Sequence, residues 1–197
     1  MKSILFLTTA NLATNPRLLK EVVFLSKDYK VNVIMFTLGN WSDTKTMALI
    51  EDTQALQEES FIHLHTKRKP LINWMFWGLS EKLARMVYPM FKHSLFINAV
   101  GNSRRSIQLY LAGKNTSVIP DFICAHNIGA LYPAWKLSKK WSVPFFFDVE
   151  DYHPGEFIQT DAANEKCRRE FLMKNCSRKL RPSQVPVHSS GNILLIS

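Results

Sequence analysis

The stretch DFICAHNIGALYPAWKLSKKWSVPFFFDVEDYHPGE, from Asp121 to Glu156, decides the predicted fold of this chain. Its pattern predicts a buried strand over 122–125, a helix over 128–141 and a second buried strand over 145–147. Two strands that are joined by a helix run parallel in one sheet. Open sheets of this kind bind their ligands beyond the carboxyl ends of the strands.

Polar residues follow both of these predicted strands. His126 and Asn127 come directly after the first strand. The loop after the second strand is rich in acids and also carries a histidine: Asp148, Glu150, Asp151, His153 and Glu156. Because both strands end at the same edge of the sheet, we expect His126 and this loop to line one crevice.

These side chains are of types that can exchange protons with a ligand: a carboxylate can take a proton, and a neutral histidine can orient the group that carries it. His126, Glu150 and Asp151 are therefore the candidate catalytic residues. A structural hydrogen bond for His126 and a turn role for Asp151 are the alternatives. Their polar neighbours are candidate substrate-binding residues: Asn127, Asp148 and His153.

The start of the chain has the same strand–helix–strand order. Apolar runs predict strands over 3–7 and 30–36, and Asn15 before a proline predicts the start of the helix between them. The intervening loop lacks the glycine-rich patterns of dinucleotide sites and P-loops. A helix N-terminus favours anions, so Asn11, Asn15 and Arg17 are candidate substrate-binding residues. Capping by Asn15 and simple exposure of Arg17 are the alternatives.

The order of elements predicts an α/β domain with a Rossmann-like doubly wound parallel sheet. We expect a turn over 39–43 and a third strand over 60–65. His63 and His65 share one face of that strand, and we interpret them as ordinary strand residues. Further helices are expected over three stretches: 46–58, 94–112 and 161–175.

Composition narrows the possible partners and compartment. The net charge of +9 and the pI near 9.6 indicate an anionic partner. No nucleic-acid motif accompanies this charge, so we expect no nucleic-acid partner. Three cysteines without metal-site spacing favour a reduced, cytoplasmic setting, and we expect neither a metal nor a cofactor. No apolar run approaches the ~18 residues of a membrane span.

The stretch KRKPLINWMFWGLSEKLARMVYPMFK, over 67–92, is basic, aromatic and amphipathic. Its apolar residues recur at spacings of three and four: Ile72, Phe76, Leu79, Leu83, Met86 and Met90. A helix over 70–92 with this pattern can lie on an anionic membrane, and a helix that covers a sheet or a partner domain has the same pattern. The first interpretation predicts a membrane-surface binding module on the inner face of the plasma membrane. Its predicted contact residues are Trp74, Trp77 and Arg85.

Three motifs together resemble one enzyme family. The segments TNPRLLKE, AHNIGAL and FDVEDYHPGE are similar to the N-terminal half of bacterial group-one, or family-four-like, glycosyltransferases, over residues 1–175. The resemblance implies a GT-B-type domain on the acceptor side of the enzyme. It implies transfer of a sugar from a nucleotide-sugar donor to a saccharide or lipid-linked acceptor in cell-envelope polysaccharide synthesis.

The resemblance also assigns roles to particular residues. It implies that the loop from Asn11 to Arg17 helps to bind the acceptor and the donor phosphate, and that His126 lies beside the reacting sugar. The usual glycines of that loop are missing here. The family's second domain holds the nucleotide-sugar site and has no counterpart after residue 175, so we expect this fragment to be inactive alone.

The last stretch, 176–197, matches neither the preceding pattern nor the family. It contains two prolines and five serines and ends in ILLIS. We expect an aberrant or disordered tail. A one-base shift of the reading frame near Lys174 is our hypothesis for its origin, and the coding DNA decides it.

Overall fold

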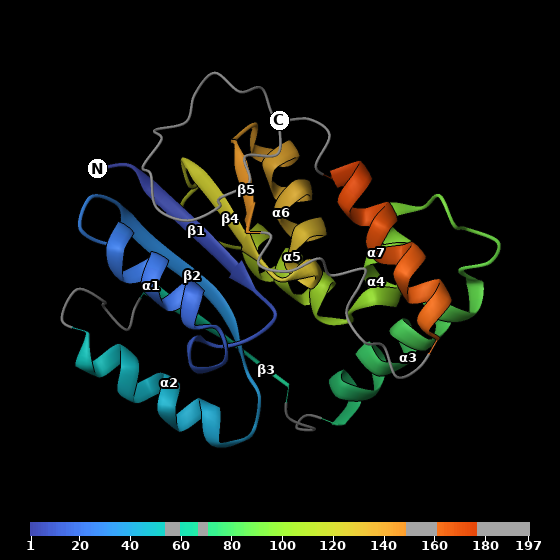
Figure 1. The fold of residues 1–197 in the computed structure, drawn as a ribbon, viewed down its shortest axis with the longest axis horizontal. Helices are drawn as coiled ribbons and strands as arrows, with labels where there is room; N and C mark the ends of the chain where they lie inside the picture. The colour runs from blue at the N-terminus through green and yellow to red at the C-terminus, as the bar shows by residue number, and fades with distance from the viewer. Residues whose placement is uncertain (54–59, 67–70, 149–160, 177–197) are drawn as a thin grey trace.

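The computed structural model describes residues 1–53, 60–66, 71–148 and 161–176. Within these ranges, five parallel strands form one sheet in the order β3-β2-β1-β4-β5 (Figure 1). The strands are β1 (Ser3–Thr8), β2 (Lys30–Thr37), β3 (Phe61–His65), β4 (Phe122–His126) and β5 (Phe145–Asp148). This arrangement confirms the predicted Rossmann-like doubly wound α/β fold.

The order of the strands reverses beside β1. The chain first builds the sheet outward from β1 through β2 to β3, and then returns to the other side of β1 with β4 and β5. In the register of the sheet, Thr8 pairs with His126, and His126 pairs with Asp148. The last residues of these three strands therefore form one row at the carboxyl edge, at the point where the order of the strands reverses.

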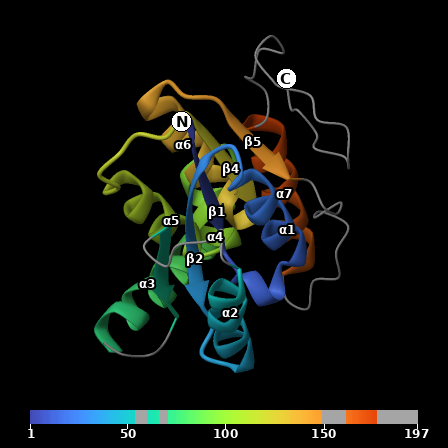
Figure 2. The ribbon, with the colours of Figure 1, turned by 90° about the vertical axis from the view of Figure 1, so that its left-hand side faces the viewer.

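Helices cover both faces of the sheet (Figures 1 and 2). One face packs against α1 (Pro16–Leu25) and α2 (Trp41–Asp52), with a short 3-10 turn, η1 (Leu12–Thr14), between β1 and α1. The other face packs against four helices: α4 (Leu95–Asn102), α5 (Arg105–Lys114), α6 (Ile128–Trp141) and α7 (Ala162–Cys176). Helix α3 (Leu71–Val87) packs against α4 instead of the sheet.

The two covered faces explain the continuous apolar runs of the strands. In β1 every residue is buried, with Ile4 and Phe6 in the core on the α1 side and Leu5 and Leu7 in the core on the α6 side. Strands that are buried on both faces lack the alternation of polar and apolar residues. The sequence therefore predicted the strands well.

Two helix predictions were wrong at their boundaries. Helix α2 begins at Trp41, inside the expected turn, because the Asn40 side chain caps it by accepting a hydrogen bond from the Ser42 amide at 3.0 Å. The single helix expected over 94–112 is two helices, α4 and α5. Ser103 is extended between them, and its hydroxyl accepts a hydrogen bond from the Arg105 amide.

Helix α7 ends one residue later than the predicted domain. Cys176 is its last residue and is buried in the core, so it belongs to the domain and not to the tail. Residues 177–197, and with them the reading-frame hypothesis, lie outside the described residues.

A buried arginine holds α7 in place. The Arg168 side chain is fully buried, and its Nη2 lies 2.7 Å from Glu165 Oε2 and 2.8 Å from Asp161 Oδ2. Its guanidinium group also lies 5.1 Å from the centre of the Tyr88 ring, just beyond the end of α3. Glu165 is buried as well, and it accepts a hydrogen bond from Asn102 at the end of α4. This network connects α7 with α4 and with the end of α3.

Replacement of this arginine is expected to destabilise the domain. The change Arg168→Ala breaks the buried ion pair with Glu165 Oε2, although Arg169 Nε stays 3.1 Å from the other carboxylate oxygen, Oε1. Breaking a buried ion pair by removing one partner typically costs about 3–5 kcal/mol. We expect a loss of that size in the free energy of unfolding, measured by urea denaturation. Lys166→Ala, at an exposed position of the same helix, is the control and is expected to change stability by less than about 0.5 kcal/mol. Equal stability of the two variants would contradict a structural role for Arg168.

Candidate functional site

The candidate site lies at the carboxyl edge of the sheet, on the face covered by α1. His126 and Asp148 are the last residues of β4 and β5, and they are neighbours in the sheet register. The His126 ring lies 5.9 Å from the ring of Phe6, which belongs to the core on the α1 side. Helix α1 lies over this face and contributes Arg17 and Glu21, which are one helical turn apart.

His126 lies between two carboxylates. Its Nε2 is 3.1 Å from Glu21 Oε2, and its Nδ1 is 3.4 Å from Asp148 Oδ2. The histidine side chain is only 1% exposed. Whichever ring nitrogen carries the proton therefore has a carboxylate acceptor, and the ring is held in one orientation. Such an arrangement can hold a proton and pass it to or from a carboxylate.

Arg17 completes a chain of charges with Asp148. Its Nε lies 3.2 Å from Asp148 Oδ2 and 4.0 Å from Glu21 Oε1. Asp148 is 2% exposed, and a buried carboxylate is stable only with such partners. The predicted site residues Arg17, His126 and Asp148 are therefore brought together. The exposed-surface alternative for Arg17 is wrong, because its guanidinium group is turned towards the sheet edge.

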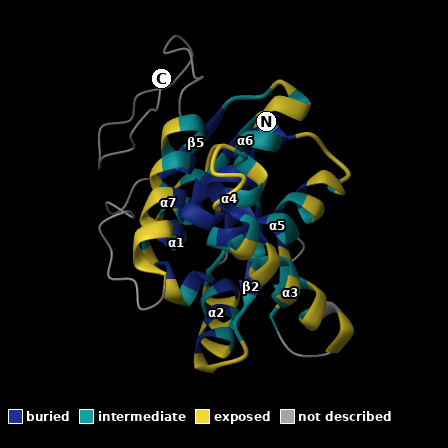
Figure 3. Cartoon of the chain, turned by 90° about the vertical axis from the view of Figure 1, so that its right-hand side faces the viewer, coloured by how far each residue is buried: buried dark blue, intermediate teal, exposed yellow. Residues whose placement is uncertain are grey.

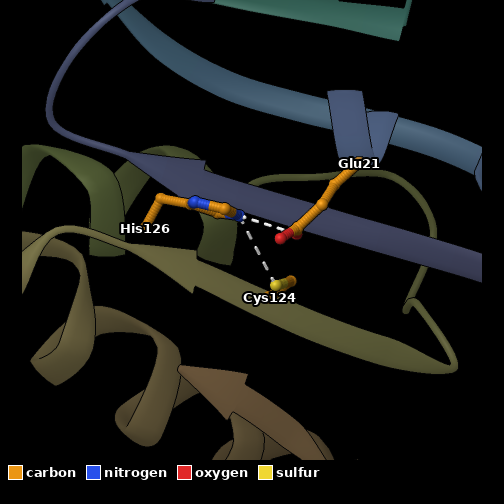
Figure 4. Close-up of side chains that lie close together, drawn as sticks. All are labelled: Glu21, Cys124 and His126. Atoms are coloured by element: carbon orange, nitrogen blue, oxygen red, sulfur yellow. Dashed lines mark hydrogen bonds and ion pairs between the residues drawn. The ribbon is translucent and has the colours of Figure 1, made fainter. Parts of the chain in front are cut away.

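Cys124 is the third neighbour of the imidazole (Figure 4). Its Sγ lies 3.8 Å from His126 Nε2, and the sulfur, this nitrogen and a Glu21 carboxylate oxygen are within 4.8 Å of one another. These are donor types of metal sites. Burial raises the pKa of the Cys124 thiol well above its ordinary value, and the carboxylates of Glu21 and Asp148 raise it further. Because metals bind the thiolate, we interpret the contact as a weak hydrogen bond.

Asn127 has a strained backbone directly after His126. Its φ of 72° and ψ of 151° fall in a region that strongly favours glycine. The side-chain Oδ1 accepts hydrogen bonds from Thr8 Oγ1 at 2.8 Å, from the Thr9 amide at 3.1 Å and from Thr9 Oγ1 at 3.2 Å. These bonds join the ends of β1 and β4. Asn127, predicted to bind substrate, thus uses its carbonyl oxygen within the protein.

The two other predicted asparagines also have bonds within the protein. Asn11 is 1% exposed, accepts a hydrogen bond from the Thr14 amide and donates to Ser42 Oγ at 2.7 Å. Asn15 caps α1 by accepting from the Leu18 amide at 3.0 Å, which confirms the capping alternative. The buried Asn15 Nδ2 has no acceptor among the described residues. Substrate binding by Asn11 and Asn15 stays a prediction.

Two charged residues of this edge were missed by sequence reasoning. Glu21 is the last residue of the quoted TNPRLLKE motif, and its position four residues after Arg17 on a helix was the available signal. Arg105 donates from Nη1 to the Thr9 carbonyl oxygen at 2.6 Å and packs against the Phe36 ring. Burial lowers the pKa of Arg105, and the adjacent Arg104 lowers it further. No sequence signal pointed to Arg105, because a continuous helix was expected there.

The remaining predicted site residues fall into two groups. Glu150, Asp151 and His153 lie outside the described residues, so their catalytic and binding roles stay predictions. Trp74, Trp77 and Arg85 belong to α3, where all three are half-buried.

Comparisons with known proteins add no assignment to this geometry. A scan against protein-family models matches no family, and searches among curated proteins and among solved structures find no match. The resemblance to glycosyltransferases therefore stays a hypothesis, and a proposal of function depends on the site.

Substitution of Asn127 tests its backbone strain. Both Asn127→Ala and Asn127→Gly lose the accepted hydrogen bonds, but only glycine relieves the strain. We expect the alanine variant to lose about 2 kcal/mol of unfolding free energy and the glycine variant about 1 kcal/mol less than that. Urea denaturation measures both values.

The exposed Asn164 in helix α7 is the matched control for this comparison. At that position alanine is expected to be more stable than glycine by about 1 kcal/mol, which is the reverse order. If alanine is more stable than glycine at both positions, Asn127 has no backbone strain and the interpretation is wrong.

Thiol labelling tests the environment of Cys124. Thiol reagents attack the thiolate, and burial also raises the pKa of the Cys176 thiol to about 12. We expect the exposed Cys167 to react first at neutral pH, with Cys124 and Cys176 much slower, as followed by mass spectrometry of labelled peptides. Cys167→Ser should abolish the fast phase. Rapid labelling of Cys124 would identify it as a thiolate and would refute the hydrogen-bond interpretation.

Proposed function

We propose that this domain is the acceptor-side half of a GT-B-type glycosyltransferase. The enzyme would move a sugar from a nucleotide-sugar donor to a saccharide or lipid-linked acceptor in cell-envelope polysaccharide synthesis. The observation that carries the proposal is the buried His126 between Glu21 and Asp148, at the point where the strand order reverses. Doubly wound sheets bind ligands at this point. In the proposal, a second domain supplies the donor.

The arrangement around His126 fits activation of a hydroxyl group. In the transfer, an acceptor oxygen forms a bond to the anomeric carbon of the donor, the bond to the donor phosphate breaks, and the hydroxyl proton leaves. A carboxylate beside the site takes that proton, and His126, oriented by Glu21 and Asp148, positions the hydroxyl. Glu21 is 18% exposed, so it is more accessible than Asp148 to a bound acceptor.

Positive charge at the same edge supports a phosphate-containing donor. Arg17 and Arg105 lie on the two faces of the sheet beside the end of β1. Helices α1 and α6 both begin at this edge, and α6 has no side-chain cap on its first turn. Helix N-termini and arginines stabilise the charge that develops on a leaving phosphate. In this proposal, the arginines and the helix N-termini bind the donor phosphate in place of the loop glycines that the chain lacks.

Saccharide binding tests the proposal directly on this chain. We expect a panel of saccharide acceptors to give saturation-transfer NMR signals with the full chain. His126→Ala and Asp148→Asn should weaken the binding at least about tenfold, because the first removes the group that positions the hydroxyl and the second alters the carboxylate that holds His126 in orientation. His93→Ala, at an exposed histidine outside the site, is the control and should bind as the unmodified chain does. If no saccharide binds, or if all three variants bind equally, the acceptor assignment is wrong.

Catalysis requires the chain to be joined to a nucleotide-sugar-binding second domain. In such a two-domain protein, Glu21→Gln and His126→Ala are expected to lower the transfer rate by about 10²–10⁴-fold. Failure of the two-domain protein to glycosylate any lipid or saccharide acceptor would refute the enzymatic proposal.

A further inference from the structure

Helix α3 exposes a long apolar face that no described residue covers. Its members are apolar and between 46% and 80% exposed, and they form the α3 stripe together with Met90 in the turn after the helix: Leu71, Ile72, Met75, Phe76, Leu79, Leu83, Met86 and Met90. Within the helix the positions recur at spacings of three and four, so they share one side of it. Figure 3 shows that α3 is largely exposed along its length. A contiguous apolar surface of this kind marks an interaction site.

The opposite side of α3 fixes the helix to the domain. Ala84 and Tyr88 are buried, and Arg85 Nε donates a hydrogen bond to the Gly101 carbonyl oxygen of α4 at 2.9 Å. Trp74 is half-buried and lies beside Arg104, whose guanidinium group is 5.7 Å from its ring centre. Membrane contact by Trp74, Trp77 and Arg85 stays a prediction. The helix is anchored without using the stripe, so the stripe is available to a partner.

The charge around the stripe is mainly positive. Between Leu71 and His93 the sequence has a single acid, Glu81, whose Oε1 lies 2.7 Å from Arg85 Nη2. Lys82 is exposed within the stripe, and the exposed Lys92 follows its end. The sequence KRK precedes the helix at 67–69. The stripe is therefore apolar with a positive border, in a chain of net charge +9.

We propose that α3 docks the domain on an anionic membrane surface. Leucine, methionine and phenylalanine side chains can enter the boundary between headgroups and acyl chains, and each nearby lysine contributes about 1 kcal/mol of attraction to anionic lipid. A second copy of the chain would instead bring the lysines of two stripes together without compensating acids. None of the described helices is long and apolar enough to cross a bilayer, so the proposed helix lies on the surface.

The stripe lies near the edge that carries the candidate site. Helix α3 begins soon after β3, whose carboxyl end belongs to that edge (Figure 1). Arg104 stacks 5.7 Å from the ring centre of Trp74, and the next residue, Arg105, donates to the Thr9 carbonyl oxygen at the end of β1. Helix α3 is therefore connected through two consecutive arginines with the end of β1, which belongs to the edge that carries the candidate site. The docking itself does not rest on the proposed transferase function.

Vesicle flotation with the full chain tests the docking. We expect binding to vesicles of phosphatidylcholine and phosphatidylglycerol, and much weaker binding to vesicles of phosphatidylcholine alone. The double change Leu79→Glu/Leu83→Glu places charge in the middle of the stripe and should weaken binding to the anionic vesicles at least about tenfold. Circular dichroism checks that the variant keeps its fold, which is expected because both side chains are exposed.

The matched control is Val118→Glu/Ile119→Glu. This exposed apolar pair lies before β4, at the opposite edge of the sheet, and the change adds the same charge. Full binding by the control and loss by the stripe variant supports the proposal. The proposal is overturned if the unmodified chain does not float, if both double variants lose binding equally, or if neutral and anionic vesicles bind equally. A different result would assign the stripe to a second copy of the chain. In that case the unmodified chain would not bind vesicles, and sedimentation would show a dimer that is lost in the stripe variant and kept in the control.

Discussion

The parallel pairing of β1 with β4 is the constraint on which the site depends. These strands are far apart in the chain, and their pairing creates the reversal of strand order beside β1. The strained Asn127 clamps the junction by accepting hydrogen bonds from Thr8 and Thr9. Gly129 allows the close approach, because a Cβ at that position would lie 2.7 Å from Thr9 Cγ2. Strain of this kind persists only where the surroundings enforce it.

This junction brings groups from three separate segments to one histidine. Helix α1 follows β1 and contributes Arg17 and Glu21, while the ends of β4 and β5 contribute His126 and Asp148. Each buried charge has an opposite charge or an imidazole beside it, and these interactions offset the free-energy cost of removing the charges from water. In the proposed transfer, this buried group would orient a hydroxyl group and accept its proton.

Helix α3 is connected with the sheet edge that carries the candidate site. The stacking of Arg104 on Trp74 and the bond from Arg105 to Thr9 connect α3 with the end of β1 through two consecutive residues. The buried Arg168 network, which joins α7 to α4 and to Tyr88, holds the other end of α3.

Local patterns in the sequence were sufficient for the sheet and for part of the site. Apolar runs predicted the strands, Asn15 before Pro16 predicted the start of α1, and strand-end polarity identified His126 and Asp148, because these signals need only neighbours in the chain. Tertiary packing decided the rest. The orientation of α1 over the sheet brings Glu21 next to His126, and the break between α4 and α5 places Arg105 at the end of β1. The periodicity of α3 marked its apolar stripe, but only its packing against α4 left that stripe facing outward, since the outward side of a helix depends on contacts made by distant residues.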